Sequence, residues 1–111
     1  MDKAHLDRVE KRLREFRIIR EGSRRTYRLG VNQVSLLLYI LKEVAKAAKP
    51  NQPLNKVEIS PSNSDLMPHV SCYGITGCLK RLEQHGLIHR RIVQEGAFPV
   101  RYLRIKGEWW R

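Results

Sequence analysis

Residues 70–105 read VSCYGITGCLKRLEQHGLIHRRIVQEGAFPVRYLRI, and this stretch decides the fold. Ser71 can cap a helix, and Gly86 is placed to end it. Behind that glycine, residues 87–93 and 100–105 form two strand-like runs. The segment QEGAFP between them contains a glycine that allows a tight turn. The stretch therefore predicts a helix followed by a two-stranded hairpin.

The predicted helix has two unlike sides. At 100° per residue, Ile75, Leu79 and Leu82 fall on one narrow stripe that suits a core. The opposite side is polar, with one cation and little bulk, and carries Tyr73, Thr76, Gly77, Lys80 and Gln84. A helix that enters the major groove of DNA needs such a side, with short donors and acceptors and few carboxylates. The alternative is an ordinary solvent-exposed helix side.

The residues before this stretch predict three further elements. Asn32 is a candidate N-cap for VSLLLYILKEVAKAA, whose broad apolar face is typical of a central core helix that stops at Pro50. Residues 54–59 (LNKVEI) alternate with period two and predict a short strand. The segment SPSNS is rich in capping residues and predicts a short helix over residues 65–69.

The N-terminal segment predicts an amphipathic helix from Met1 to about Ile19. Its apolar stripe consists of Leu6, Val9, Leu13 and Phe16. The stripe packs either on the body of the chain or on a second copy, and both alternatives stay open. A break near Gly22 precedes a short strand over about residues 27–31. At the other end of the chain, we expect Trp109 and Trp110 to dock on the body or on a partner.

The charge of the chain points to a polyanionic partner. The 111 residues carry 22 Lys and Arg against 11 Asp and Glu, a net charge of +11 with a pI near 10.3. Such an excess repels itself in a compact chain, and nucleic acid is the first candidate to neutralise it. The longest apolar run is too short for a membrane span, and the charged N-terminus is no secretory signal. We expect a cytoplasmic protein with reduced thiols.

The positive charge is unevenly distributed. Residues 1–31 carry 10 basic and 5 acidic side chains, and residues 87–111 carry 6 and 2. Residues 61–86, which include the predicted helix, carry 2 and 2. This division is expected when flanking segments contact phosphates and a neutral helix contacts bases. The cluster Arg24, Arg25 and Arg28 is the best candidate for an additional backbone or minor-groove contact.

The motif ITGCLKRLEQHGLIHRR resembles the recognition helix and wing of the winged helix-turn-helix superfamily, most closely the MarR-type bacterial and archaeal regulators. The matching positions are Ile75, Leu79, Leu82, Gly86, Leu87, Ile88, Arg90 and Arg91. The resemblance covers roughly residues 31–105. It implies a mainly α fold with a small β-hairpin wing (α+β). In this reading residues 1–31 form an N-terminal helical arm, residues 32–106 the DNA-binding domain and residues 107–111 a tail.

The resemblance also implies residue roles and partners. Base contacts would come from Ser71, Tyr73, Thr76 and Lys80, and phosphate contacts from Arg90, Arg91 and Arg101. The partners would be double-stranded DNA and a second copy of the chain, with no cofactor, membrane or small-molecule substrate. The chain departs from the family at Gly74 and Gly77, where longer polar residues are common. A glycine inside a helix costs about 0.8–1 kcal/mol against alanine. This cost suggests either a close backbone approach to DNA or a partner, or a recognition helix that is only partly ordered alone.

Three function classes follow. The first is a homodimeric transcriptional regulator, and the second is a winged-helix component of a replication, partition or ribosomal nucleoprotein complex. The third, a protein–protein adaptor, would leave the charge without a role. An enzyme is not expected, because no HExxH, phosphate-binding loop or nucleophile elbow is present. Zinc is not expected either, because the spacing of His69, Cys72, Cys78, His85 and His89 does not match a zinc site.

Overall fold

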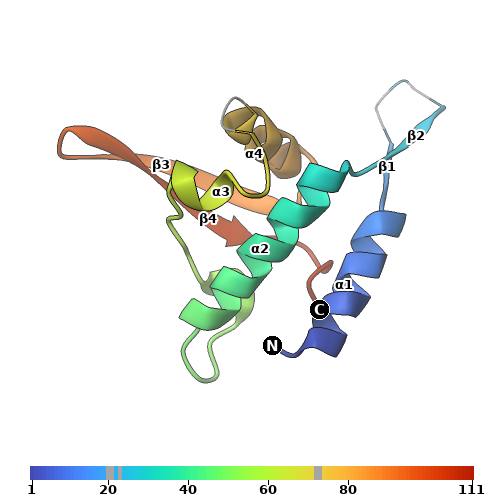
Figure 1. The fold of residues 1–111 in the computed structure, drawn as a ribbon, viewed down its shortest axis with the longest axis horizontal. Coiled ribbons are helices and arrows are strands. Elements are labelled where there is room, and N and C mark those ends of the chain that lie inside the picture. The colour runs from blue at the N-terminus through green and yellow to red at the C-terminus, as the bar shows by residue number, and fades with distance from the viewer. Residues whose placement is uncertain (20–21, 23, 72–73) are drawn as a thin grey trace.

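The computed structural model of the protein describes residues 1–19, 22, 24–71 and 74–111 (Figure 1). Over these residues the chain has an α+β fold with four α-helices and two antiparallel hairpins. In chain order the elements are α1 (Lys3–Glu15), β1 (Arg17–Ile19), β2 (Thr26–Arg28), α2 (Val31–Ala47), a 3-10 turn (Leu54–Lys56), α3 (Asn63–Leu66), α4 (Ile75–Gln84), β3 (Ile88–Glu95) and β4 (Phe98–Ile105). Every helix in this part of the chain is too short or too polar to cross a bilayer.

Helix α2 runs through the centre of the core, as its apolar face predicts. Its fully or nearly fully buried side chains are Val34, Leu36, Leu37, Ile40, Leu41 and Val44. The expected N-cap at Asn32 is wrong, because the helix begins at Val31 with Gly30, two residues earlier, as its cap. The Gly30 N–H donates to the Gln33 side chain at 2.9 Å, so a residue inside the helix satisfies the cap amide.

Helix α1 is shorter than predicted. Asp2 caps it by accepting from the His5 N–H at 2.8 Å, and it ends at Glu15 rather than near Ile19. The residues behind it form β1, in which Ile18 pairs with Tyr27 of β2. Ile18 and Ile19 are β-branched, which favours an extended backbone over continuation of the helix. The second strand covers residues 26–28 and not 27–31.

The apolar stripe of α1 packs within the chain. Val9 and Leu13 are 0% exposed, and Leu6 and Phe16 are partly buried against the same core. This is the intramolecular one of the two alternatives. Val9 and Leu13 have no exposed surface left through which the expected dimer contact could form.

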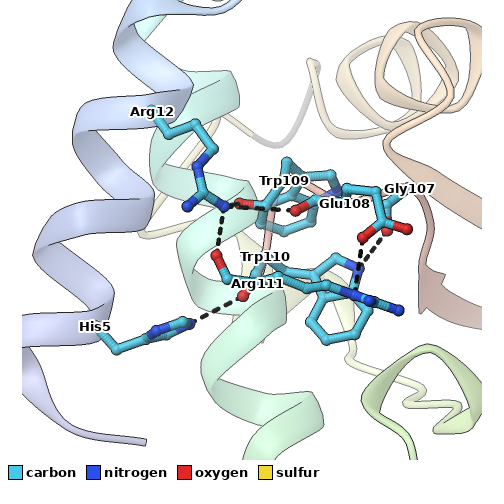
Figure 2. Close-up of polar contacts among 7 residues, drawn as sticks. All are labelled: His5, Arg12, Gly107, Glu108, Trp109, Trp110 and Arg111. Carbon is cyan, nitrogen blue, oxygen red and sulfur yellow. Dashed lines mark hydrogen bonds and ion pairs between the residues drawn. The ribbon is translucent and has the colours of Figure 1, made fainter.

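The C-terminal tail docks on the body, as expected for its two tryptophans. Trp109 is 4% exposed, and its indole N–H donates to the Leu87 carbonyl at 2.8 Å. Figure 2 shows two side chains of α1 pointing toward the tail. The Arg12 guanidinium donates to the backbone carbonyls of Glu108, Trp109 and Arg111. The His5 ring contacts the Trp110 carbonyl oxygen at 2.9 Å. The tail therefore fastens α1 to the rest of the chain.

The strand predicted over residues 54–59 is mostly wrong. Residues Leu54–Lys56 form a 3-10 turn that starts at Pro53. Ile59 alone of this segment pairs with another strand: its N–H donates to the Leu103 carbonyl at 3.0 Å, and the Leu103 N–H donates back at 2.8 Å. Ile59 therefore lies beside β4 and forms a single-residue β-bridge at the edge of the β3–β4 sheet.

Helices α3 and α4 both begin away from their expected positions. Ser62 and Asp65 cap each other reciprocally, so α3 covers residues 63–66 instead of 65–69. Helix α4 begins at Ile75 with Gly74 as its N-cap, and Ser71 accepts the Gly74 N–H through its backbone carbonyl instead of capping the helix.

The β3–β4 hairpin follows α4 as predicted. Gly86 ends the helix with a φ of 74°, and Gly96 forms the turn with a φ of 62°, which are both values that favour glycine. The strands pair along their whole length, from Ile88 with Ile105 to Glu95 with Phe98. They are longer than expected because the pairing extends to the residues next to the turn.

Candidate nucleic-acid interface

Helix α4 turns a polar side to the surface. Ile75, Leu79 and Leu82 are buried, which confirms the predicted core stripe, and Cys78 is buried beside them. The exposed residues, which we call the outer side of α4, are Thr76, Gly77, Lys80, Arg81 and Gln84. Ser71 is also exposed, just before the helix. Tyr73 lies outside the described residues.

Sequence reasoning missed Arg81 on this side. Arg81 follows Lys80 and lies 40° from Gly77 on a helical wheel, close enough to share its face. It makes no ion pair with a carboxylate in the described ranges. A periodicity count that included both edges of the polar arc would have found it. With Arg81 the outer side carries two cations rather than one.

The one carboxylate of α4, Glu83, is turned away from the outer side. It accepts a hydrogen bond from the Arg90 backbone N–H at 3.0 Å, and its other oxygen lies 3.7 Å from the Arg90 guanidinium. Helix and hairpin are fixed to each other by these contacts. The outer side is therefore free of carboxylates.

The arginines expected to contact phosphates have partners inside the chain. Arg91 donates two hydrogen bonds to the Glu58 carboxylate, at 2.9 and 3.2 Å, and its guanidinium lies 4.5 Å from the centre of the Tyr102 ring. Arg90 pairs with Glu83, as described above. Arg101 donates to the Asn63 side chain at 3.2 Å. The sequence pattern gave no sign of these contacts, because most of the partners lie on distant segments.

These contacts change the protonation equilibria of the hairpin. The hydrogen bonds from Arg91 hold the pKa of Glu58 below its ordinary value of 4.5, and they raise the pKa of Arg91 in turn. Nearby charges of Arg104 and His89 lower the pKa of Glu58 further. Burial, helped by the charge of Arg90, lowers the pKa of Arg101. The base of the hairpin is thus a charged cluster around one carboxylate.

Two large apolar side chains of the β3–β4 hairpin are exposed, one beside the turn and one midway along β3. Phe98 is 76% exposed and Ile92 is 59% exposed. Glu95, which pairs with Phe98 across the strands, accepts a hydrogen bond from the Tyr102 hydroxyl at 2.6 Å. Arg101 lies opposite Ile92, and Arg90, Arg91 and Arg104 lie on the side of this pair away from the turn.

The second hairpin lies on the other side of α4. Figure 1 shows β3–β4 projecting at one end of the longest axis and β1–β2 toward the other, with α4 between them. Arg24, Arg25 and Arg28, the predicted additional contact, are all exposed here. Two hairpins with cationic residues thus flank the outer side of α4.

The candidate zinc ligands do not come together. His69 forms a 2.8 Å hydrogen bond with Ser35 and packs against the Tyr39 ring. Burial raises the pKa of the Cys78 thiol, and Cys72 lies outside the described residues. Across the described ranges, no three His, Cys, Asp or Glu residues are close enough to hold a metal ion.

Comparisons with family models, with curated proteins and with solved structures find nothing similar to this chain.

Proposed function

We propose that this protein is a sequence-specific double-stranded DNA-binding protein that inserts α4 into the major groove. The proposal takes residues 32–106 as a winged helix-turn-helix domain. Its support is the order of elements, in which α2, the strand position at Ile59, α3, α4 and the β3–β4 hairpin follow one another, with Ile59 beside β4. In that reading β3–β4 is the wing.

One observation carries the proposal: the outer side of α4 is exposed, cationic and free of carboxylates. The side chains of Thr76 and Gln84 can donate and accept hydrogen bonds at base edges, and Lys80 can donate to the acceptor atoms of guanine in the major groove. Gly77 adds no bulk between them. A helix side that only needs to be solvated has no reason to exclude carboxylates in this way.

The internal partners of the wing arginines do not prevent phosphate contacts. Arg91 and Glu58 are both partly exposed, and surface pairs of this kind contribute about 0–1 kcal/mol. A phosphate near the hairpin can therefore replace Glu58 as the partner of Arg91 at small cost. The same holds for the neutral contact between Arg101 and Asn63.

The oligomeric state of the bound protein rests on the resemblance alone. Regulators of the MarR type are dimers, and two-fold proteins read half-sites about 34–36 Å apart. In this chain Val9 and Leu13 of the α1 stripe, for which a dimer contact was one of two alternatives, are fully buried within the chain, and Leu6 and Phe16 are partly buried. A homodimer would use another surface, and the mass of the complex in solution measures it.

Selection of bound duplexes from a random pool tests the proposal. We expect enrichment of one short motif, and we expect the enriched duplex to survive competition by bulk DNA, duplex RNA and single-stranded RNA. Lys46→Ala, on an exposed part of α2, is the control and should enrich the same motif. Preferential binding of structured RNA would contradict the proposal and favour a ribosomal role. Enrichment of no motif would leave a non-specific nucleoprotein component.

A further inference from the structure

A groove of about 750 Å³ separates the β1–β2 hairpin from α4. Its lining residues come from the β1–β2 hairpin, the first turn of α2, the segment before α4 and α4 itself. Tyr27 and Arg28 belong to the hairpin, Gly77 and Arg81 belong to α4, and residues 31–33 belong to the first turn of α2. This space has no signature in the sequence, because residues 27–28 and 77–81 are far apart in the chain and only the fold brings them together.

The lining of the groove suits an anion. Arg28 and Arg81 reach it from different elements, and neither makes an ion pair with a carboxylate in the described ranges. None of its described lining residues is Asp or Glu. The amino end of α2 adds partial positive charge of the same sign. A ligand with spaced negative charges would neutralise both arginines at once.

Gly77 leaves open space on the side of α4 that faces the groove. A Cβ at this position would meet nothing within 4 Å, and the backbone is helical, so alanine fits without strain. Gly74 differs, because a Cβ there would lie 3.3 Å from a methyl group of Val70. Packing within the chain therefore accounts for Gly74 but not for Gly77. The missing side chain at residue 77 leaves space on the groove side, outside the fold.

We propose that this groove binds the phosphodiester backbone of one DNA strand, with Arg28 and Arg81 on its phosphates and Gly77 at the point of closest approach. The inference rests on the proposed function, since the strand would border the major groove that α4 enters. The β1–β2 hairpin then acts as a second wing, opposite β3–β4. A single chain holds the duplex on both sides of α4, over at most roughly 13 base pairs for its 46 Å length.

Gly77→Ala gives the first test. The variant should melt a few degrees above the wild type, because alanine favours the helix, while its affinity for duplex DNA falls at least several-fold. A purely structural glycine would show the opposite melting shift. Unchanged affinity in the more stable variant would overturn the inference.

The two arginines give the second test, through the salt dependence of duplex binding. Arg28→Ala and Arg81→Ala should each reduce the slope of log affinity against log salt by about 0.9. Arg8→Ala, on the exposed side of α1, is the matched control and should leave the slope unchanged. Hydroxyl-radical footprinting should show that the Arg28 variant loses protection on one flank of the site only.

The outcomes separate the inference from the proposed function. If the wild-type protein binds no duplex DNA, both the proposed function and the groove assignment are wrong. If neither arginine variant changes the salt slope of duplex binding but Lys80→Ala weakens binding, the proposed function stands. The assignment of the groove is then wrong. Inorganic phosphate is the remaining arm. In the contrary outcome, phosphate raises the melting temperature of the wild type but not of Arg28→Ala or Arg81→Ala, while these variants leave the salt slope of DNA binding unchanged. That result would assign the groove to a free anion and overturn the inference.

Discussion

At the scale of single residues, Arg91 makes a two-point contact with Glu58, which lies 33 positions earlier in the chain. The contact favours the ionised carboxylate and so holds the pKa of Glu58 below 4.5. The charge of Arg91 was visible in the sequence, but its partner was not. No spacing or motif connects the two residues, because only the fold brings residues 58 and 91 together.

The lowered pKa of Glu58 predicts a pH dependence of stability. The carboxylate contributes stability that is complete above about pH 4.5 and is lost as pH falls through the lowered folded-state pKa. Glu58→Gln should therefore lower the melting temperature at pH 6 and have a smaller effect at pH 3. Thermal denaturation at the two pH values measures this. In an Arg91→Ala background the effect of Glu58→Gln should become smaller, because only the weaker influence of Arg104 and His89 remains. An equal effect at both pH values would refute the assignment.

At the scale of elements, helix periodicity predicted the sides of α4 and the core face of α2 well. In both helices the apolar residues recur at helical spacing, so they lie on one face, and this face is the one buried in the core. The end of α1 was predicted less well, because residues 17–19 continue its polar and apolar pattern while pairing with β2. The segment 54–59 alternated like a strand, yet only Ile59 has a neighbouring strand to pair with.

The link between α1 and the C-terminal tail could not be predicted from the sequence, and it carries a prediction about stability. Arg12 contacts three tail carbonyls, whereas Arg14 of the same helix pairs with Glu10 on the surface. Arg12→Ala should lower the free energy of unfolding by roughly 1–2 kcal/mol. Arg14→Ala is the matched control and should change it by less than about 0.5 kcal/mol. Denaturant titration measures both, and equal effects would show that the tail contacts are not stabilising.

At the scale of the whole molecule, the charged segments of the chain and the positions of the two hairpins agree with each other. The excess of positive charge lies before and after the neutral segment 61–86, and in the fold these charged parts include two hairpins on either side of α4. The sequence predicted the charge distribution and the β3–β4 hairpin. It did not predict that β1–β2 would lie across a groove from α4, since that position depends on α1 packing against α2 and on the tail that fastens α1.

In the proposed complex with DNA, α4 contacts bases while the flanking arginines contact phosphates. The ratio of the Kd for a scrambled duplex to the Kd for the selected duplex tests this arrangement most directly. The wild type should show a ratio of at least about 10³. Lys80→Ala or Thr76→Ala should lower this ratio by about tenfold, while Arg28→Ala should weaken binding to both duplexes alike. A ratio that is unchanged by Lys80→Ala and Thr76→Ala, or that falls as much with Arg28→Ala, would contradict the account.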